Sequence, residues 1–135
     1  MTLRVVPELY CFDMSISKSY FIYVFGFSVK YERPDEDFAY LTRDGVDVML
    51  EGLNGNSRKW TTGSLDFPLG RGINFQWDVT DIEVLYRNVR ARAADSIYLD
   101  MESKEYQCGT AVITQKQFIV QTPGGFLFRF CQDVD

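Results

Sequence analysis

Two segments decide the fold of this chain: FAYLTRDG at residues 38–45 and FIVQTPGG at residues 118–125. Each begins with phenylalanine, has threonine four residues later and ends on glycine seven residues later. An apolar run that ends in a glycine-containing turn is typical of a β-hairpin. The same hairpin therefore occurs twice, which indicates a duplicated structural unit.

The elements around both hairpins follow one order: strand, Asp, helix and three strands. In the second half, Thr80 and Glu83 form a capping box, with Thr80 as the N-cap of a helix whose apolar residues recur at helical spacing. We therefore predict an α+β single domain over residues 1–135, built from duplicated βαβββ modules at 4–53 and 70–133 with a linker loop at 54–69. A chance echo within an unduplicated α+β domain remains the alternative. The predicted strands are 5–12, 27–32, 38–42, 46–51, 73–79, 97–101 (with a continuation toward 106), 117–121 and 126–131, and the first helix is 15–25, with Gly26 at its C-terminal cap.

Charge and histidine content exclude several classes of function. Nineteen acidic and fourteen basic residues give a net charge of −5, whereas proteins that bind a phosphate backbone usually carry a basic stripe. The chain has no histidine, which removes Ser-His-Asp and Cys-His catalysis and His-ligated zinc. We therefore expect no nucleic-acid partner and no histidine-based catalysis.

Cysteine usage and hydropathy favour a cytoplasmic location. The three cysteines, Cys11, Cys108 and Cys131, are odd in number and form no C-x-x-C pair, which is typical of a reducing compartment. Residues 1–8 lack the apolar core of a signal peptide. The most apolar run, 20–27, is far shorter than the ~20 residues of a membrane span. We expect a cytoplasmic protein without a membrane partner.

Side-chain alternation predicts which residues lie on the face of each sheet that no helix covers. Successive side chains of a strand point to opposite faces, so apolar residues at every second position mark the helix-facing side. The remaining positions lie on what we call the open face. This alternation gathers Glu8, Tyr10, Asp47, Met49, Glu51, Asn74, Gln76, Asp78 and Arg129 on the open faces, and on the last strand it also points Leu127 and Cys131 outward. A solvated face without function is the simple alternative, because antiparallel sheets often have one.

The duplicated order and several motifs resemble the vicinal oxygen chelate superfamily, which includes glyoxalase I, extradiol dioxygenases and, most similar to this chain, the bleomycin resistance proteins. The resemblance covers residues 5–131 and implies an incomplete U-shaped mixed sheet. The last turn has Thr122 and Gly124 where acids are common in the family, while Pro123 and Gly125 remain. The motifs are 7–9 (PEL), 25–27 (FGF), 38–41 (FAYL), 60–63 (WTTG), 70–75 (GRGINF) and 117–126 (QFIVQTPGGF).

The resemblance also implies positions for a metal, because the enzymes of this superfamily hold a divalent ion with one His, Gln or Glu on each of four strands. Those positions fall on Val6, Met49, Asn74 and Arg129 of this chain. None of these is a good ligand for a hard or borderline divalent cation, and Arg129 repels one. We therefore expect no metal and no cofactor.

Three functions are compatible with this reading. The first is a bleomycin-resistance-type protein that sequesters a small molecule, such as a cationic glycopeptide, in an acidic groove lined with aromatic residues. The second is a metal-free isomerase or lyase that uses groove carboxylates, Glu8, Asp78 or Glu51, as acid or base. The third is an interaction module whose groove holds a peptide.

The expected groove combines open-face residues with neighbouring aromatic residues. Phe38 and Tyr40 enter it because Ala39 and Leu41 fit better beneath a helix, and Trp60 lies at its rim in the long loop. The exposed sheet edges and the resemblance together imply a homodimer. The predicted ligand-binding residues are Glu8, Tyr10, Phe38, Tyr40, Asp47, Met49, Trp60, Asn74, Gln76 and Arg129.

Overall fold

The chain folds as two units with the same order of elements. The structure is a computed structural model that describes residues 3–134; Met1, Thr2 and Asp135 lie outside the described residues. The units are Met1–Leu69 and Gly70–Asp135. The first unit contains β1 (Glu8–Cys11), α1 (Met14–Tyr23), β2 (Ser28–Arg33), the short 3-10 helix η1 (Pro34–Glu36), β3 (Phe38–Arg43) and β4 (Val46–Gly52). The second contains β5 (Asn74–Asp78), α2 (Ile82–Ala93), η2 (Ala94–Ser96), β6 (Ile97–Cys108), β7 (Ala111–Gln121) and β8 (Leu127–Val134).

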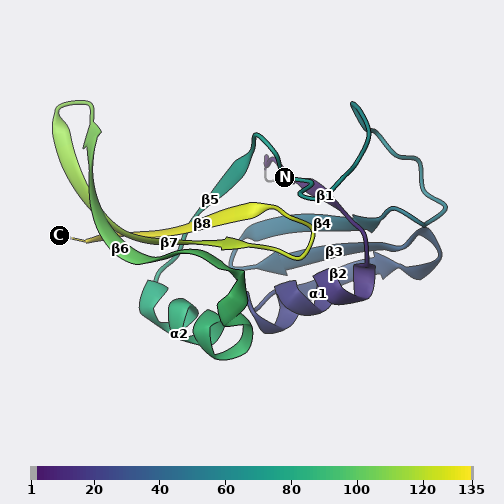
Figure 1. Ribbon diagram of the computed structural model, residues 1–135, viewed down its shortest axis with the longest axis horizontal. Coiled ribbons are helices and arrows are strands. Elements are labelled where there is room, and N and C mark those ends of the chain that lie inside the picture. Colours follow the sequence, from purple (N-terminus) through teal and green to yellow (C-terminus); the bar gives the residue numbers. More distant parts are fainter. Residues whose placement is uncertain (1–2, 135) are drawn as a thin grey trace. The chain divides into compact units, whose positions relative to one another are not determined.

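Each unit builds one four-stranded mixed sheet, and the strand order is the same in both. The orders are β1-β4-β3-β2 and β5-β8-β7-β6. In each sheet the first strand pairs in parallel with the last, and the other neighbours are antiparallel. One helix lies along one face of each sheet (Figure 1). The prediction of an α+β fold with duplicated βαβββ modules is confirmed.

Both helices begin at an aspartate that performs the same task. The Asp13 carboxylate accepts a hydrogen bond from the Ile16 N–H (3.1 Å), and the Asp81 carboxylate accepts one from the Val84 N–H (3.2 Å). Such a side chain satisfies one of the free N–H groups of the first turn. The N-cap of α2 is thus Asp81 and not the predicted Thr80. At the other end of α1, Gly26 adopts a left-handed φ of 81°, close to the predicted stop.

Both hairpin segments have a glycine with a left-handed backbone at the matching position. Gly45 and Gly125 both have positive φ, 83° and 91°, which other residues adopt only with strain. In the second hairpin the turn is closed by the Gly125 N–H, which donates to the Thr122 carbonyl (2.8 Å). The loops differ in length, however: Asp44 and Gly45 join β3 to β4, whereas residues 122–126 join β7 to β8.

Aromatic residues dominate the core of each unit. In the first unit Phe21 and Phe25 are fully buried and meet edge to face, with ring centroids 5.2 Å apart. In the second, Phe118 and Phe130 stack with centroids 5.0 Å apart, and α2 covers them with Val89 and its other buried residues. The helix-facing alternation predicted for β8 accounts for the burial of Phe130.

Several strand boundaries differ from the prediction for physical reasons. β1 begins at Glu8 rather than at 5, because Pro7 has no N–H to donate to the ladder, although its carbonyl accepts from Met49. Ile73, expected in β5, lies before that strand and is half exposed. β6 and β7 are about twice as long as expected and form a hairpin that projects beyond its sheet (Figure 1). The added part, 102–116, is mostly polar, and its few apolar residues do not alternate with polar ones.

No helix in the described part of the chain is long and apolar enough to cross a bilayer. Residues 54–69, predicted as a linker, contain neither helix nor strand.

The two valines of β7 provide a matched test of this fold. Val120 is fully buried and Val112 is 58% exposed, so Val120→Ala and Val112→Ala remove the same atoms from opposite environments. We expect Val120→Ala to lower the free energy of unfolding by about 2 kcal/mol, through lost apolar burial and a cavity. Val112→Ala should change it by less than about 0.5 kcal/mol. Urea titrations followed by circular dichroism measure both, and equal losses would contradict the burial of Val120 beneath α2.

Candidate functional site

The strand register of the first sheet brings the predicted residues of that unit onto one face. Tyr40 pairs with Met49, which pairs with Glu8 in turn; Phe38 pairs with Glu51, which pairs with Tyr10. Register partners on neighbouring strands point to the same side. The predicted residues Glu8, Tyr10, Phe38, Tyr40, Asp47 and Met49 therefore share one face, as the alternation predicted.

Asp47 is a fixed negative charge on this face. Its carboxylate accepts hydrogen bonds from the hydroxyls of Thr42 and Tyr40, both at 2.6 Å, and forms an ion pair with Arg4 at 3.4 Å. The bond from Thr42, then that from Tyr40, holds the pKa of Asp47 below its usual value, because both stabilise the charged form. The hydrogen bond between Tyr40 and Asp47 also raises the pKa of the Tyr40 phenol. Asp47 therefore stays ionised near neutral pH, with its orientation set by two donors.

β2 contributes residues to this face that the sequence analysis missed. The Tyr31 ring stacks on Tyr40 with centroids 5.0 Å apart, and the Arg33 guanidinium lies 4.0 Å from the centre of the Phe38 ring. The ammonium of Lys30 lies 5.1 Å from the centre of Tyr40. Phe38 and Tyr40 are consequently buried, and their rings are covered by groups of the chain itself.

A β-bulge explains why Tyr31 was missed. Val29 pairs with Leu41 and Tyr31 pairs with Tyr40, so two steps along β2 correspond to one step along β3. Without this irregularity, Tyr31 would share the helix-facing side with Val29. The bulge instead moves Tyr31 to the open face. Simple alternation cannot anticipate such a shift.

Glu51 was predicted on the open face, but it is only 2% exposed. Burial is the largest cause of the raised pKa of its carboxyl, and the neighbouring carboxyl of Glu8 raises it further by charge and by hydrogen bonding. Lys59 acts in the opposite direction. The prediction of a solvent-facing Glu51 was wrong; it forms the buried half of a carboxyl pair with the exposed Glu8.

Trp60 is 62% exposed, and its backbone is fixed to β1. Its N–H donates to the Tyr10 hydroxyl (2.7 Å), which in turn donates to the Trp60 carbonyl (3.4 Å). The Arg58 guanidinium lies 4.4 Å from the centre of the indole. The predicted rim residue is thus attached to a predicted site residue, with its ring in solvent except where Arg58 covers it.

The remaining three predicted residues belong to the second sheet. Asn74 and Gln76 lie on β5 and are exposed, and Arg129 lies on β8 and is half-buried. Gln76 is the register partner of Arg129, whose guanidinium donates to the Gln76 amide oxygen at 2.7 Å. A second bond from this guanidinium goes to the amide oxygen of Gln117 on β7 (3.3 Å). Gln76 and Arg129 are therefore in direct contact.

Gln117 is a functional candidate that the sequence analysis overlooked. It is 4% exposed, and it also donates to Glu102 (2.9 Å) and accepts from the Tyr106 hydroxyl (2.9 Å). Alternation along β7 could have found it, because Phe118 and Val120 point toward the helix. Its register partner Cys131 lies on the same face, as the alternation predicted, and is also buried.

The cysteines are poor nucleophiles where they are buried. Cys11 and Cys131 are buried free thiols, and Cys108 is an exposed one. Burial raises the pKa of Cys11 to about 11 and also raises that of Cys131. Both thiols stay protonated near neutral pH, so neither supplies the thiolate that covalent catalysis requires.

The four positions at which the family resemblance implies a metal do not form a metal site. Valine at 6 offers no donor, and Arg129 brings a positive charge that already binds two amide oxygens. Met49 offers a thioether and Asn74 only an amide oxygen, a set that no hard or borderline divalent ion prefers. Residues 3–134 also contain no group of three or more His, Cys, Asp or Glu side chains able to hold an ion. The donor set does not fit a divalent metal.

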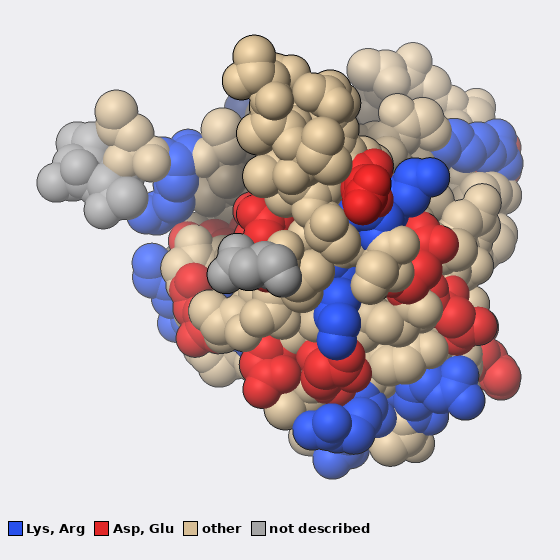
Figure 2. Space-filling view, turned by 90° about the vertical axis from the view of Figure 1, so that its left-hand side faces the viewer, with Lys and Arg blue, Asp and Glu red and all other residues tan. Residues whose placement is uncertain are grey.

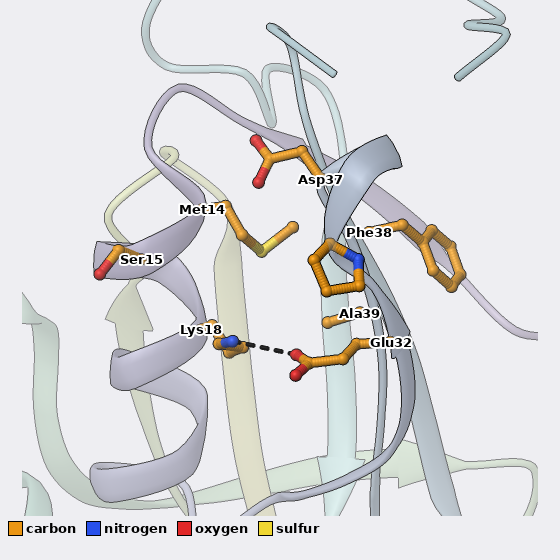
Figure 3. A pocket seen from close by; sticks show the side chains of 8 residues that line it. Met14, Ser15, Lys18, Glu32, Asp37, Phe38 and Ala39 are labelled. Atoms are coloured by element: carbon orange, nitrogen blue, oxygen red, sulfur yellow. Dashed lines mark hydrogen bonds and ion pairs between the residues drawn. The ribbon is translucent and has the colours of Figure 1, made fainter. Parts of the chain in front are cut away.

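A cavity of about 290 Å³ lies between α1 and the strands β2 and β3. An ion pair between Lys18 and Glu32 (3.0 Å) spans it, and Met14 points into it, whereas the Phe38 ring is directed away (Figure 3). It therefore lies on the helix side of the first sheet. Of the predicted site residues, Phe38 is among those that line it, with its ring directed away. On the face of the molecule seen in Figure 2, acidic and basic side chains are interspersed without a large patch of one sign.

Comparisons with known proteins find one solved structure that is similar in sequence and others that are similar only in fold. A crystal structure of a glyoxalase/bleomycin resistance protein/dioxygenase superfamily member from Vibrio splendidus 12B01 is 64% identical in sequence; the alignment covers 98% of this chain and 100% of that one, with a TM-score of 0.47. TioX from Micromonospora sp. ML1 is 19% identical, with coverage of 98% and 100% and a TM-score of 0.73. A bleomycin resistance determinant encoded on the transposon Tn5 is 16% identical, with coverage of 97% and 98% and a TM-score of 0.62. No family model matches this chain, and a search of curated proteins found no match.

The sequence identity to the Vibrio protein carries the argument about the family. The two more distant structures support the fold alone, because their identity to this chain is low.

The buried carboxyl of Glu51 gives a stability prediction with a definite pH dependence. A pKa that is higher in the folded state means that the folded protein binds more protons, so stability falls as pH rises past the unfolded value of about 4.5. Glu51→Gln removes this cost, and we expect a higher free energy of unfolding at pH 7 and a much smaller gain at pH 4. The exposed Glu105→Gln is the control and should shift stability by less than about 0.5 kcal/mol. Urea titrations at both pH values measure this; a Glu51→Gln variant destabilised at pH 7 would contradict the assignment.

Proposed function

Because the chain belongs to the glyoxalase/bleomycin resistance protein/dioxygenase superfamily, we propose that it is a metal-independent binding protein that sequesters a small cationic aromatic drug or metabolite. Membership rests on 64% identity over nearly the whole chain. The four positions implied for a metal carry residues that do not suit one, which favours binding over the metal-dependent chemistry of the superfamily.

One observation carries the proposal: aromatic rings of the first unit already bind cations. Arg33 lies over Phe38, Lys30 over Tyr40 and Arg58 over Trp60, at 4.0, 5.1 and 4.4 Å from the ring centres. The face of an aromatic ring attracts a cation through its quadrupole, and the attraction strengthens when water is excluded. A ligand that carries a flat ring and a cation can replace these internal contacts with its own. Trp60 is the most accessible of the three rings.

The carboxylates on this face have a supporting role in the proposal. Asp47 stays ionised and Glu8 is exposed, so both attract a cationic ligand. Arg4 forms an ion pair with Asp47, which reduces the net negative charge of this face. We therefore assign steering and orientation to the acids and most of the binding free energy to aromatic contact. The proposed binding residues are those predicted from the sequence: Glu8, Tyr10, Phe38, Tyr40, Asp47, Met49, Trp60, Asn74, Gln76 and Arg129.

A second candidate function is a metal-free isomerase or lyase, and the Glu8–Glu51 pair favours it. A buried carboxyl with a raised pKa beside an exposed carboxyl can act as an acid while its neighbour acts as a base. Such an enzyme would lose turnover in both Glu8→Gln and Glu51→Gln. The binding function requires only that Glu8 retain its charge.

We also propose that the protein is a cytoplasmic homodimer. Its free cysteines suit a reducing compartment. β2 is an edge strand whose residues are all exposed, and edge strands are commonly protected by pairing with another chain. Sedimentation at micromolar concentration tests this proposal, and a 15.6 kDa species would refute the dimer.

Replacement of Trp60 tests the binding function directly. Bleomycin and benzylamine serve as probes, one a cationic glycopeptide and the other a minimal aromatic cation. We expect Trp60→Ala to weaken binding of a probe by ~1–3 kcal/mol, as for an aromatic hot spot. Asp47→Asn should weaken it less, and its effect should shrink with added salt. Isothermal titration calorimetry measures both effects.

The matched control is Tyr98→Ala, which removes an equally exposed aromatic ring from the second unit (66% against 62%). This variant should bind both probes as the unchanged protein does. Unaltered affinity in Trp60→Ala would remove this residue from the site. Absence of saturable binding of both probes would overturn the proposed function.

A further inference from the structure

Arg129 is held in place by hydrogen bonds to two neutral side chains on the strands that flank it. One terminal nitrogen donates to the Gln76 oxygen on β5 (2.7 Å) and the other to the Gln117 oxygen on β7 (3.3 Å). Gln117 is almost fully buried, which restricts its movement. The guanidinium is thus fixed from both sides on the open face of its sheet.

Two carboxylates determine how these amides are oriented. The Gln76 NH₂ group donates to Asp78 (3.0 Å), and the Gln117 NH₂ group donates to Glu102 (2.9 Å). An ionised carboxylate only accepts hydrogen bonds, so each amide must turn its NH₂ toward the acid and its oxygen toward Arg129. Each glutamine therefore separates a carboxylate from the guanidinium by the length of an amide.

The consequence is a positive charge without a direct counterion. Arg129 forms no ion pair with the described residues, in contrast to Arg4, Arg33, Arg43 and Arg90. A guanidinium has five N–H donors, and the two bonds to glutamine use two of them. Arg129 is half-buried, so its remaining donors are partly dehydrated but still accessible.

We propose that Arg129 recognises a carboxylate of a small molecule bound at the open face of the second sheet. This inference rests on the proposed function, because it requires that the ligand contacts the open face of the second sheet. The planar guanidinium matches the two oxygens of a carboxylate, and charge-assisted bonds of this kind are among the stronger ones in proteins.

The surroundings select a singly charged anion with an apolar body. Ile119 and Leu127 are half-buried on the same face, Ile119 as register partner of Arg129. They offer apolar contact beside the guanidinium. Asp78 and Glu102 are exposed and separated from Arg129 by the amides, so solvent and salt screen their repulsion of one negative charge. A phosphate dianion would meet twice that repulsion with only one arginine to offset it.

A purely structural role for Arg129 makes a different prediction from carboxylate recognition. If the residue only joins the three strands, a carboxylate in place of Gln76 should leave its role intact or strengthen it by an ion pair. If Arg129 recognises an anion, the same change neutralises the guanidinium and removes the site. Gln76→Glu keeps the size of the side chain and lies at an exposed position, so it separates the two roles.

The experiment titrates the full chain with benzoate, inorganic phosphate and benzylamine, and follows the side-chain Nε–H signal of Arg129 and the backbone amides by NMR. Benzoate should bind saturably and shift the Arg129 signal, and phosphate should bind much more weakly. Arg129→Gln and Gln76→Glu should each weaken benzoate binding at least ~10-fold, the loss expected for a charge-assisted contact. Arg87→Gln, at an exposed helix position, is the matched control and should bind benzoate unchanged.

Benzoate affinity that is unaffected by Arg129→Gln or by Gln76→Glu, in variants whose amide spectra show the native fold, would overturn the inference. So would the lack of saturable benzoate binding, or tighter binding of phosphate than of benzoate. Benzylamine binding to the unchanged chain distinguishes this failure from failure of the proposed function, because it does not depend on any variant of the second sheet. Loss of benzoate binding alone contradicts the role of Arg129, and lack of benzylamine binding contradicts the cationic aromatic ligand.

Discussion

The two-residue period of the strands decides which side chains of this protein can meet a ligand. In β4 and β8, every second residue must be apolar to pack beneath a helix, and the intervening positions are left for other uses. Phe128 and Phe130 are buried in this way, and Arg129 between them is directed to the opposite face. A shift of one residue in either strand would exchange the two sets, so the core and the candidate site depend on the same register.

On the open faces, charges are arranged in partnerships rather than as an acidic lining. Asp47 is bound by two hydroxyls and an arginine, and Glu51 is buried beside another carboxyl. The positive groups also have different partners: Arg33 lies over an aromatic ring, and Arg129 is held by amides. The electrostatic character of the site therefore depends on which groups have a counterion, and not on the net charge of −5.

Much of the fold could be predicted from the sequence because its signals are local. The aspartate before each helix, the glycine after each hairpin and the apolar alternation each depend on a few neighbouring residues. The long β6–β7 hairpin was underestimated, since its outer part packs on neither face and its polar sequence shows no alternation.

The candidate site was less predictable because it depends on contacts between distant residues. Tyr31 reaches the open face only through a bulge, and burial of Glu51 depends on what covers it rather than on its own strand. Gln117 could have been assigned by alternation, but its bonds to Glu102 and Arg129 come from two other strands. The residues were placed on the correct faces, and their partners were not foreseen.

The claim that binding requires no metal is tested most directly by elemental analysis of the protein purified without chelators. We expect far less than one zinc, nickel or iron ion per chain, because Val6, Met49, Asn74 and Arg129 provide no suitable donor set. About one such ion per chain, retained through gel filtration, would contradict it.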